Sequence, residues 1–480
     1  MTACLMARAW PHAVVTVIES PEIGIVGVGE GSTPQLRTFF ARLGIAEADW
    51  MPHANATYKA GIAFHGWSAR TPAYFHPFQT AIDGFTAPAF FESTRARRAG
   101  LDVPAHPDRF FVPAWLAEHR RAPTAPEHFP FDIGYGYHFD AHLIGVVLRD
   151  HAVGRLGVHH LQRRMTQVLL AASGDVEALI LEGGETFAAD LFVDGSGFRS
   201  AIAQTAMRVP FHEFGNNLFN DRAVTIPTPA DPSGTNAHTS ATALSAGWAW
   251  DIPLTNRTGN GYVYSSRYLS PDAAEAELRA HLGAAAGDTP ARHLEMKVGR
   301  IATTWTRNCL AVGLAQGFIE PLEATALHIV QSTVDGFIEA YETGDFGAAK
   351  RDEFNARIAA RYEGIRDYIV CHYRVNTRGD TEYWRDNATN PALSDTLKAV
   401  LTAWFTGQDL DAEVARLKIG SYYSALSWHC LLAGYGTFPD DSRLHALAQP
   451  GPDLVAINDF VRRCGLNFPD HREALARLRG

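Results

Sequence analysis

Two segments of the chain run from a short β-branched stretch into glycines and then into a helical stretch. They are AADLFVDGSGFRSAIAQ, which contains Gly195 and Gly197, and NCLAVGLAQGFIEPLEATALHIVQSTVDGFIEAY. A strand that leads into glycines and then a helix is typical of sheets that bind a nucleotide, because the glycines let the backbone approach the phosphates. We therefore predict an α/β fold with a nucleotide-binding sheet.

The N-terminal segment looks like the second half of a βαβ unit. MTACLMARAW has helical spacing and precedes HAVVTVIES, a short strand that ends in Glu19. In dinucleotide-binding units an acid at this place hydrogen-bonds ribose hydroxyls, and a Gly-rich turn before the helix holds the pyrophosphate. The acid is present here and the turn is not, so a solvated carboxylate at a strand end explains Glu19 equally well.

The next segment, GIVGVGEGSTPQLRTFFARLG, combines three glycines with the start of a helix. Ser32 or Thr33 is expected to cap a helix that has Pro34 in its first turn. Such a loop before a helix N-terminus suits an anion or the edge of a flavin.

Composition argues against several classes of partner. The 480 residues carry a formal charge of −10 and have a pI near 6.1, and no Lys/Arg run is interleaved with aromatics, so we expect no nucleic-acid partner. The five cysteines are scattered and form no C-x-x-C pair, which indicates reduced thiols in a cytoplasmic protein and no metal site. We also expect no signal peptide and no membrane span, since no window reaches roughly 18 apolar residues.

Length and periodicity predict two regions, because the chain exceeds the usual size of one domain core. We expect an α/β region over residues 1–344 and a helical subdomain over residues 345–480 that packs over it. Stretches rich in Phe, His, Trp and Pro, such as HGWSARTPAYFHPFQT, resemble the walls of a substrate cavity more than a repeat.

Two strand-like stretches contain unusual residues. NATYKAGIAFHGW has a single charge, Lys59, which by itself is best explained as a strand-end lysine that snorkels to water. GWAWDIPL places Trp248 and Trp250 two residues apart, so both rings lie on one face of a strand. By composition alone, this pair predicts aromatic core packing.

The pattern G-W-x-W-x-I-P resembles the signature of flavin-dependent halogenases of the tryptophan and indole type. Further motifs of that family occur in the expected order up to about Tyr341: IESPEIGIVGVGEGSTPQL, NATYKAGIAFHGW, YGYHFDAHL, DLFVDGSGFRS and GFIEPLEATA. The resemblance implies a flavin monooxygenase-like FAD-binding fold with a mixed β-sheet substrate region. It makes residues 1–344 the FAD-binding and halogenation module and residues 345–480 a helical substrate-binding subdomain.

The resemblance also implies the chemistry. FADH2 from a separate flavin reductase reacts with oxygen and a bound chloride or bromide to give hypohalous acid, which passes through a tunnel to Lys59. Lys59 then hydrogen-bonds the hypohalous acid or is halogenated at nitrogen, and a task of this kind explains a desolvated lysine. Trp248 and Trp250 become the barrier between flavin and substrate. Glu323 stabilises the cationic arene intermediate or accepts its proton, whereas Glu320 is structural.

Other positions match family sites for the halide and the substrate. Thr325 and Ala326 match the backbone donors for the halide at a helix start; Ala326 restricts positive φ, which puts the halide geometry in doubt. His76 and Phe78, in YFHPF, match residues that sandwich an indole. The remaining predicted tunnel or substrate residues are Pro321, Tyr423 and Trp428. The predicted cofactor-binding residues are Glu19, Gly27, Gly29, Glu30, Gly31, Ser32, Thr33, Asp194, Gly195, Gly313 and Gly317.

Two departures from the family stand out. The strand and G-x-G-x-x-G turn that the family has before its first helix are missing, and we expect a start truncated relative to the natural protein. The residues that grip the amino and carboxyl groups of free tryptophan are not found, so we expect an indole-like or other electron-rich arene in its place. A larger or carrier-bound arene stays open.

Two alternatives stay open. A flavin monooxygenase of the same fold would hydroxylate its substrate without halide, although the paired tryptophans argue against it. A non-catalytic protein that binds a flavin or another ligand would have lost the chemistry altogether. The sequence also leaves a homodimer open.

Overall fold

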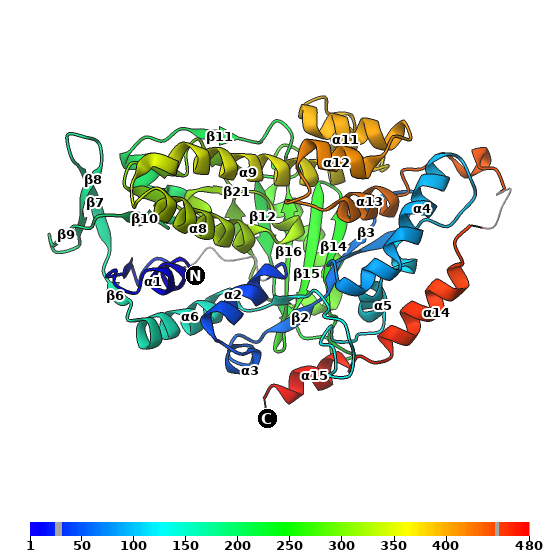
Figure 1. Ribbon diagram of the computed structural model, residues 1–480, viewed down its shortest axis with the longest axis horizontal. Coiled ribbons are helices and arrows are strands. Elements are labelled where there is room, and N and C mark those ends of the chain that lie inside the picture. The colour runs from blue at the N-terminus through cyan, green and yellow to red at the C-terminus, as the bar shows by residue number, and fades with distance from the viewer. Residues whose placement is uncertain (25–30, 447–450, 480) are drawn as a thin grey trace. The chain divides into compact units, whose positions relative to one another are not determined.

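In a computed structural model, residues 1–24, 31–446 and 451–479 are described, and they form a mixed α/β protein with C-terminal helices (Figure 1). The chain forms two compact units, each made of three separate segments. Unit 1 comprises Met1–Ala54, Phe139–Gly215 and Met296–Glu363, and unit 2 comprises Asn55–His138, Asn216–Glu295 and Gly364–Gly480. Residue 344 lies inside one of these segments, and the functional division at that residue remains a prediction.

Unit 1 holds the strands predicted to bind a nucleotide. Strand β1 pairs in parallel with β6, and β10 pairs in parallel with β20, with β19 antiparallel on its far side. Two three-stranded sheets, β7-β8-β9 and β11-β18-β21, complete the strands. The bounds are β1 Thr16–Glu19, β6 His159–Gln162, β7 Met165–Leu170, β8 Val176–Leu181, β9 Thr186–Phe187, β10 Phe192–Asp194, β11 Phe211–Glu213, β18 Gly299–Ile301, β19 Trp305–Thr306, β20 Cys309–Ala311 and β21 Gly317–Phe318.

The helices of unit 1 follow the predicted pattern. A helix begins at the N-terminus, and another follows the second glycine segment, as the periodicity indicates. The bounds are α1 Thr2–Ala9, α2 Gln35–Leu43, α3 Glu47–Trp50, α6 Ala141–Leu156 and α8 Ala326–Thr343. Pro34 occupies the N-cap of α2, which has no side-chain cap hydrogen bond. The N-cap residue is thus Pro34 and neither Ser32 nor Thr33, because the helix begins at Gln35, later than predicted.

Unit 2 is built around an eight-stranded mixed sheet in the order β17-β12-β16-β15-β14-β3-β4, with β13 paired to β16. Strands β14, β15 and β16 are antiparallel neighbours, while β14 and β3 are parallel. A separate two-stranded sheet pairs β2 with β5. The bounds are β2 Thr57–Lys59, β3 Gly61–His65, β4 Ala73–Pro77, β5 Gly136–His138, β12 Arg222–Thr225, β13 Thr228–Pro229, β14 Thr239–Leu244, β15 Gly247–Pro253, β16 Arg257–Tyr264 and β17 Arg292–Glu295.

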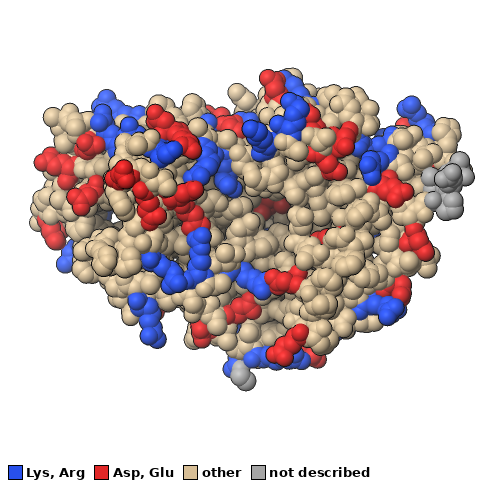
Figure 2. All heavy atoms as spheres, in the orientation of Figure 1, with Lys and Arg blue, Asp and Glu red and all other residues tan. Residues whose placement is uncertain are grey.

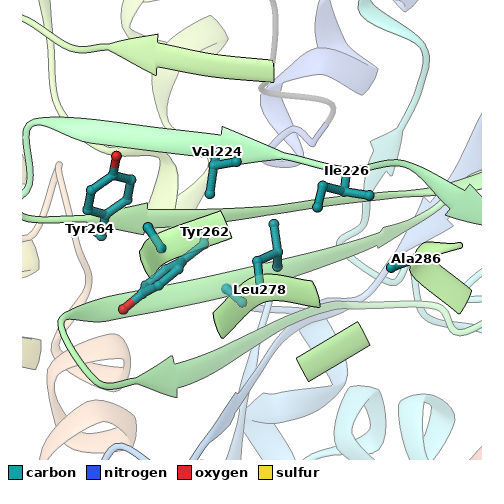
Figure 3. Close-up of a cluster of buried hydrophobic side chains, with 8 residues drawn as sticks. Val224, Ile226, Tyr262, Tyr264, Leu278 and Ala286 are labelled. Carbon is teal, nitrogen blue, oxygen red and sulfur yellow. The ribbon is translucent and has the colours of Figure 1, made fainter. Parts of the chain in front are cut away.

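Helix α7 (Pro271–Leu282) packs against this sheet and buries its apolar face. Figure 3 shows Tyr262 and Tyr264 from β16, Val224 from β12 and Leu278 from α7 in one cluster. Alternate residues of β14 are buried, as expected of a strand that places one face on a core. Burial of these large side chains, at roughly 25 cal/mol per Å² of apolar area, stabilises the sheet.

The C-terminal helices of unit 2 begin at side chains that satisfy free backbone N–H groups. Thr381, Ser394, Asp409 and Ser424 each accept a hydrogen bond from an N–H in the first turn of the helix that follows. Caps of this kind typically contribute about 1 kcal/mol each. The helices of unit 2 are α4 Ala87–Arg98, α5 Val112–Glu118, α10 Glu382–Thr389, α11 Asp395–Phe405, α12 Leu410–Leu417, α13 Ala425–Gly434, α14 Leu454–Gly465 and α15 His471–Arg477, and α9 Arg351–Arg374 enters it from unit 1.

Charged side chains of both signs are interspersed on the face shown in Figure 2. Many charged side chains of the described residues form ion pairs, such as Arg42 with Asp335 at 2.6 Å. Within the described ranges, no helix combines the length and the apolar character needed to cross a bilayer. The same part of the chain contains no group of three or more His, Cys, Asp or Glu that could hold a metal ion.

Gly261→Ala should destabilise the sheet of unit 2. A Cβ at this position would lie 2.2 Å from Cζ2 of the buried Trp250 ring, so we expect the free energy of unfolding to fall by about 1–3 kcal/mol. Urea denaturation followed by circular dichroism measures this change. Gly84→Ala is the matched control, because its Cβ would meet nothing within 4 Å. Equal stability of the two variants would contradict the packing described.

Candidate functional site

Lys59 ends β2 and is almost completely buried, with an exposed fraction of 1%. Its Nζ lies 5.4 Å from the centre of the Phe78 ring, a cation–π distance. The β2–β5 ladder sets Lys59 opposite Gly136, and the next residue, Ala60, accepts a hydrogen bond from the backbone N–H of Phe78 at 2.9 Å. The strand-end lysine that snorkels to water is therefore excluded, and Lys59 and Phe78 lie together.

His76 lies on β4 and contacts an aromatic cluster that also includes two other predicted residues. Its Nε2 is 3.5 Å from the hydroxyl of Tyr368. The Tyr368 ring stacks on Tyr423, with ring centroids 3.5 Å apart, and meets Trp428 edge-on at 4.8 Å. Tyr368 thus contacts His76, Tyr423 and Trp428. The sequence analysis predicted the helix that carries Tyr368 but gave this residue no role.

Trp248 and Trp250 both lie on β15 with buried rings whose centroids are 6.1 Å apart. Spacing of two on a strand places them on the same face, as predicted. In the register of β15 with β16, Trp250 lies opposite Gly261, whose missing side chain leaves room for the indole. Among the described residues, Nε1 of Trp248 has no hydrogen-bond partner.

In unit 1, Pro321 opens a 3₁₀ turn that carries Glu323 to the start of α8. Glu323 has an exposed fraction of 4%, and Glu320, just before the turn, is also buried. Thr325 is the N-cap residue of α8. Since the first N–H groups of a helix have no partner inside it, the backbone at Thr325 and Ala326 can offer donors to an anion.

The left-handed residue in this turn is Ala324, with a φ of 54°. Ala326 is the first residue of α8 and does not have a positive φ. The predicted restriction at Ala326 is therefore wrong, because the turn places its strained residue two positions earlier. A non-glycine residue in this conformation costs on the order of 1 kcal/mol, which the surrounding structure has to offset.

The adjacent parallel strands β10 and β20 end together, with Asp194 opposite Ala311. Each then enters a glycine turn, at Gly195 and Gly313. Gly313 has a φ of 60°, and a Cβ at Gly195 would meet only Val312, at 4.0 Å. Glycine turns at the carboxyl ends of neighbouring parallel strands are where α/β sheets bind nucleotides. The space at Gly195 therefore fits a flavin that approaches the backbone.

The Asp194 side chain holds the first of these turns. One carboxylate oxygen accepts from the N–H and the hydroxyl of Ser196, and the other accepts from the Ser200 hydroxyl and the N–H groups of Ile202 and Ala203. The buried carboxylate therefore shapes the loop itself. At Gly317 a Cβ would lie 2.6 Å from the carbonyl oxygen of Gly299, so the close approach of β18 requires glycine there.

Glu19 ends β1, and its Oε1 lies 2.9 Å from Nε2 of His160 on the neighbouring strand. Its side chain is half-exposed, which is compatible with either interpretation of this acid. Ser32 is buried, while Gly31 and Thr33 are partly exposed. Gly27, Gly29 and Glu30 lie outside the described residues. An open depression of about 850 Å³ runs along α6 and β6, and its lining includes His160 but none of the predicted site residues.

Unit 2 contains several buried histidines, and His138 lies near enough to Lys59 to feel its charge. Burial lowers the pKa of His138 well below its usual value, and the charge of Lys59 contributes to this shift. Burial also lowers the pKa of His372 to about 3 and that of His471 to about 4. These imidazoles are therefore neutral near pH 7, and His138 adds no positive charge beside the lysine.

The fold and these side chains define a flavin-dependent α/β enzyme with a buried lysine and an aromatic cluster. The model of the tryptophan halogenase family matches residues 1–450, and the chain belongs to this family. It is a flavin-dependent halogenase that uses FADH2 and a halide ion, as the resemblance predicted. The comparisons favour this activity over both the hydroxylase and the non-catalytic binding protein.

Similar proteins cover the chain almost completely. The 7-chloro-L-tryptophan 6-halogenase KtzR of Kutzneria sp. (strain 744) is 36% identical over 100% of this chain and 97% of its own length. The structure of the tryptophan 6-halogenase SttH from Streptomyces toxytricini has a TM-score of 0.85 at 31% identity and covers 99% of this chain and 96% of that chain. BrvH, a flavin-dependent halogenase from Brevundimonas sp. BAL3, has the same TM-score at 31% identity, with 100% and 96% covered. The predicted FAD-binding fold is thereby confirmed.

His372→Gln should make the free energy of unfolding depend less steeply on pH in the acid range. Because the folded pKa of about 3 lies below the 6.5 of an ordinary histidine, the unfolded chain takes up a proton in this range that the folded chain does not. The stability that depends on neutral His372 is complete above pH 6.5 and is lost as the pH falls toward 3. In this window the variant should show a slope of unfolding free energy against pH that is smaller by up to about 1.4 kcal/mol per pH unit.

Urea denaturation at stepped pH values measures this slope. The exposed His128, replaced by Gln, is the matched control and should leave the slope as in the wild type. Asp83 and Asp251, whose burial raises their pKa values to about 7 and about 6, act in the opposite direction but are common to all three proteins. An unchanged slope for His372→Gln would contradict a buried neutral imidazole.

Proposed function

We propose that this halogenase halogenates an indole-like or other electron-rich arene, with Lys59 delivering the halogen and Glu323 serving as the partner carboxylate. The observation that carries the proposal is the burial of the Lys59 side chain, at 1% exposure beside an aromatic ring. A lysine is costly to bury. A place away from water suits a residue that reacts with a small oxidant, because that oxidant must itself be kept away from water.

Each of these residues is proposed to take part in one step of the reaction. Bound reduced FAD supplies, with oxygen and halide, the hypohalous acid. The N–H groups at Thr325 and Ala326 hold the halide near the start of α8, and Trp248 and Trp250 separate substrate from cofactor. Lys59 hydrogen-bonds the hypohalous acid or takes up its halogen. Glu323 stabilises the positive charge of the arene or accepts the proton that leaves when aromaticity is restored.

The aromatic residues of unit 2 support an aromatic substrate. Phe78 and His76 are proposed to enclose an indole, with Tyr423 and Trp428 as further walls, because flat rings stack on such side chains at low entropic cost. KtzR and SttH are named for halogenation of tryptophan derivatives or tryptophan. Free tryptophan therefore belongs in the substrate panel beside larger indoles, although the residues expected to grip its amino and carboxyl groups were not found.

A product assay tests the proposed function. The protein is incubated with a flavin reductase, NADH, FAD, bromide and a panel of indoles that includes tryptophan, and products are analysed by mass spectrometry. The proposal predicts products with the isotope doublet of one bromine, formed only when bromide is present. An oxygenated product that forms equally without halide would instead show the hydroxylase.

Halogenases of this class take FADH2 from a separate flavin reductase. A homodimer and a cytoplasmic location remain predictions for this chain. Sedimentation velocity of the purified protein tests the homodimer directly.

Lys59→Ala should abolish halogenated product while FADH2 oxidation continues, because the oxidant forms without the residue that delivers it. Product and flavin oxidation are counted in the same reaction by mass spectrometry and absorbance. Lys297→Ala is the matched control: Lys297 is an exposed lysine that also lies over an aromatic ring, Phe211, at 4.1 Å. Wild-type product from Lys59→Ala would refute the assigned role.

Glu323→Gln should lower kcat by about 100-fold or more, the usual effect of removing a group that moves a proton or stabilises charge in the transition state. KM for the arene should change little, since the amide has the same shape. Glu320→Gln is the matched control, because Glu320 is a buried acid three residues away in the same segment. Equal loss of kcat in both variants would show that Glu323 has no special part in the reaction.

A further inference from the structure

A histidine of α15, His471, binds the backbone of β2, the strand that carries Lys59. The backbone N–H of Tyr58 donates to Nε2 of His471 at 3.2 Å. On the other side of the ring, Nδ1 lies 3.0 Å from the carbonyl oxygen of Thr235. A carbonyl oxygen only accepts, so Nδ1 carries the proton and Nε2 has the free lone pair that the Tyr58 N–H requires. His471 can make both bonds only as the neutral imidazole.

The position of β2 makes this bond important. β2 pairs only with β5 in the described sheets, so β5 satisfies one edge of the strand and leaves the other open. An unpaired buried backbone N–H costs about 1–3 kcal/mol. His471, with an exposed fraction of 1%, satisfies the donor next to Lys59.

Hydrogen bonds within unit 2 hold the segment that bears His471 in place. The N–H of His471 donates to the carbonyl oxygen of Arg120, and the N–H of Ala122 donates to that of Pro469, both at 3.0 Å. The Arg472 guanidinium donates to the carbonyl oxygens of Pro232 and Asp231 at 3.0 and 2.6 Å. The imidazole is therefore a fixed acceptor and not a side chain that happens to lie nearby.

A second neutral histidine holds the same strand from its β5 side. The hydroxyl of Thr57 donates to the carbonyl oxygen of Pro253 at 2.7 Å, so it must accept from Nδ1 of His138 at 2.9 Å. Nε2 of His138 then accepts from the hydroxyl of Thr239, also at 2.9 Å. Pro253 ends β15, the strand of the paired tryptophans, so this network ties β2 to that strand.

We propose that His471 is a positioning residue for Lys59: as a neutral acceptor it fixes the backbone of β2 from the C-terminal helix, so that Lys59 receives the hypohalous acid rather than letting it escape. The inference rests on the proposed role of Lys59. A protonated imidazole would lose the acceptor and place a second positive charge near the lysine. His138 completes the support from the opposite edge of the strand.

The test compares His471→Leu with His471→Gln in the full-length protein, using the substrate identified for the wild type. The readout is the ratio of halogenated product to FADH2 oxidised, together with free hypohalous acid trapped by an added thiol. Leucine removes the acceptor, so this ratio should fall at least tenfold while flavin oxidation stays at the wild-type rate and trapped oxidant rises. Glutamine keeps an acceptor oxygen and should retain most of the ratio. Glu473→Gln, on the exposed side of the same helix, should match the wild type.

A His471→Leu protein that folds and keeps the wild-type ratio overturns the inference. If the leucine variant does not fold, the glutamine variant decides, because a folded His471→Gln protein with the ratio of Lys59→Ala would contradict a role for the acceptor. Failure of the proposed function gives a different result: the wild type then makes no halogenated product, or Lys59→Ala still makes it. With a productive wild type and an inactive Lys59→Ala, the result for His471 bears on the inference alone.

Discussion

The proposed site is built around a buried lysine, Lys59. Moving a charged lysine out of water costs several kcal/mol even after the protein relaxes around it. Unit 2 offers the face of the Phe78 ring, and it surrounds the strand with imidazoles that stay neutral. A charged imidazole beside Lys59 would raise the free-energy cost of burying the lysine in its protonated form. The neutral state of the histidines therefore favours the burial of Lys59.

The proposed chemistry divides between the two units of the chain. The glycine turns after β10 and β20, the acid Glu323 and the start of α8 belong to unit 1. Lys59, the paired tryptophans and the cluster around Tyr368 belong to unit 2. The residues proposed for the cofactor and the halide thus belong to unit 1, and those proposed to receive the oxidant and to enclose the substrate belong to unit 2. Glu323, in unit 1, is proposed to act on the substrate.

Local pattern in the sequence predicted much of this structure. Strands that lead into glycines, alternate burial in a strand and the two-residue spacing of the tryptophans are all properties of a few neighbouring residues. The family motifs then predicted catalytic roles for Lys59 and Glu323. The start of α2 was mispredicted because Ser32 and Thr33 are good caps by residue type, whereas the helix begins after Pro34. The residue with a positive φ in the turn before α8 is Ala324, two positions before Ala326.

Contacts between residues far apart in the sequence could not be predicted from the sequence. Tyr368 is one aromatic among several in a long helical stretch, and only the fold brings it to His76. His471 lies 413 positions from Tyr58, in a segment with no feature that marks it, and His138 was seen only as part of a family motif. A single sequence holds no signal for such pairs, because the register of β2 and the docking of α15 decide them.

In the proposed function, Lys59 and Glu323 act on one substrate molecule. A crystal structure of the protein with the substrate that the product assay identifies tests this. We expect Nζ of Lys59 and the carboxylate of Glu323 both to lie within reach of the substrate ring, at about 3 Å or through one water molecule. A structure in which the bound substrate contacts one of these groups while the other lies beyond a bridging water would contradict it.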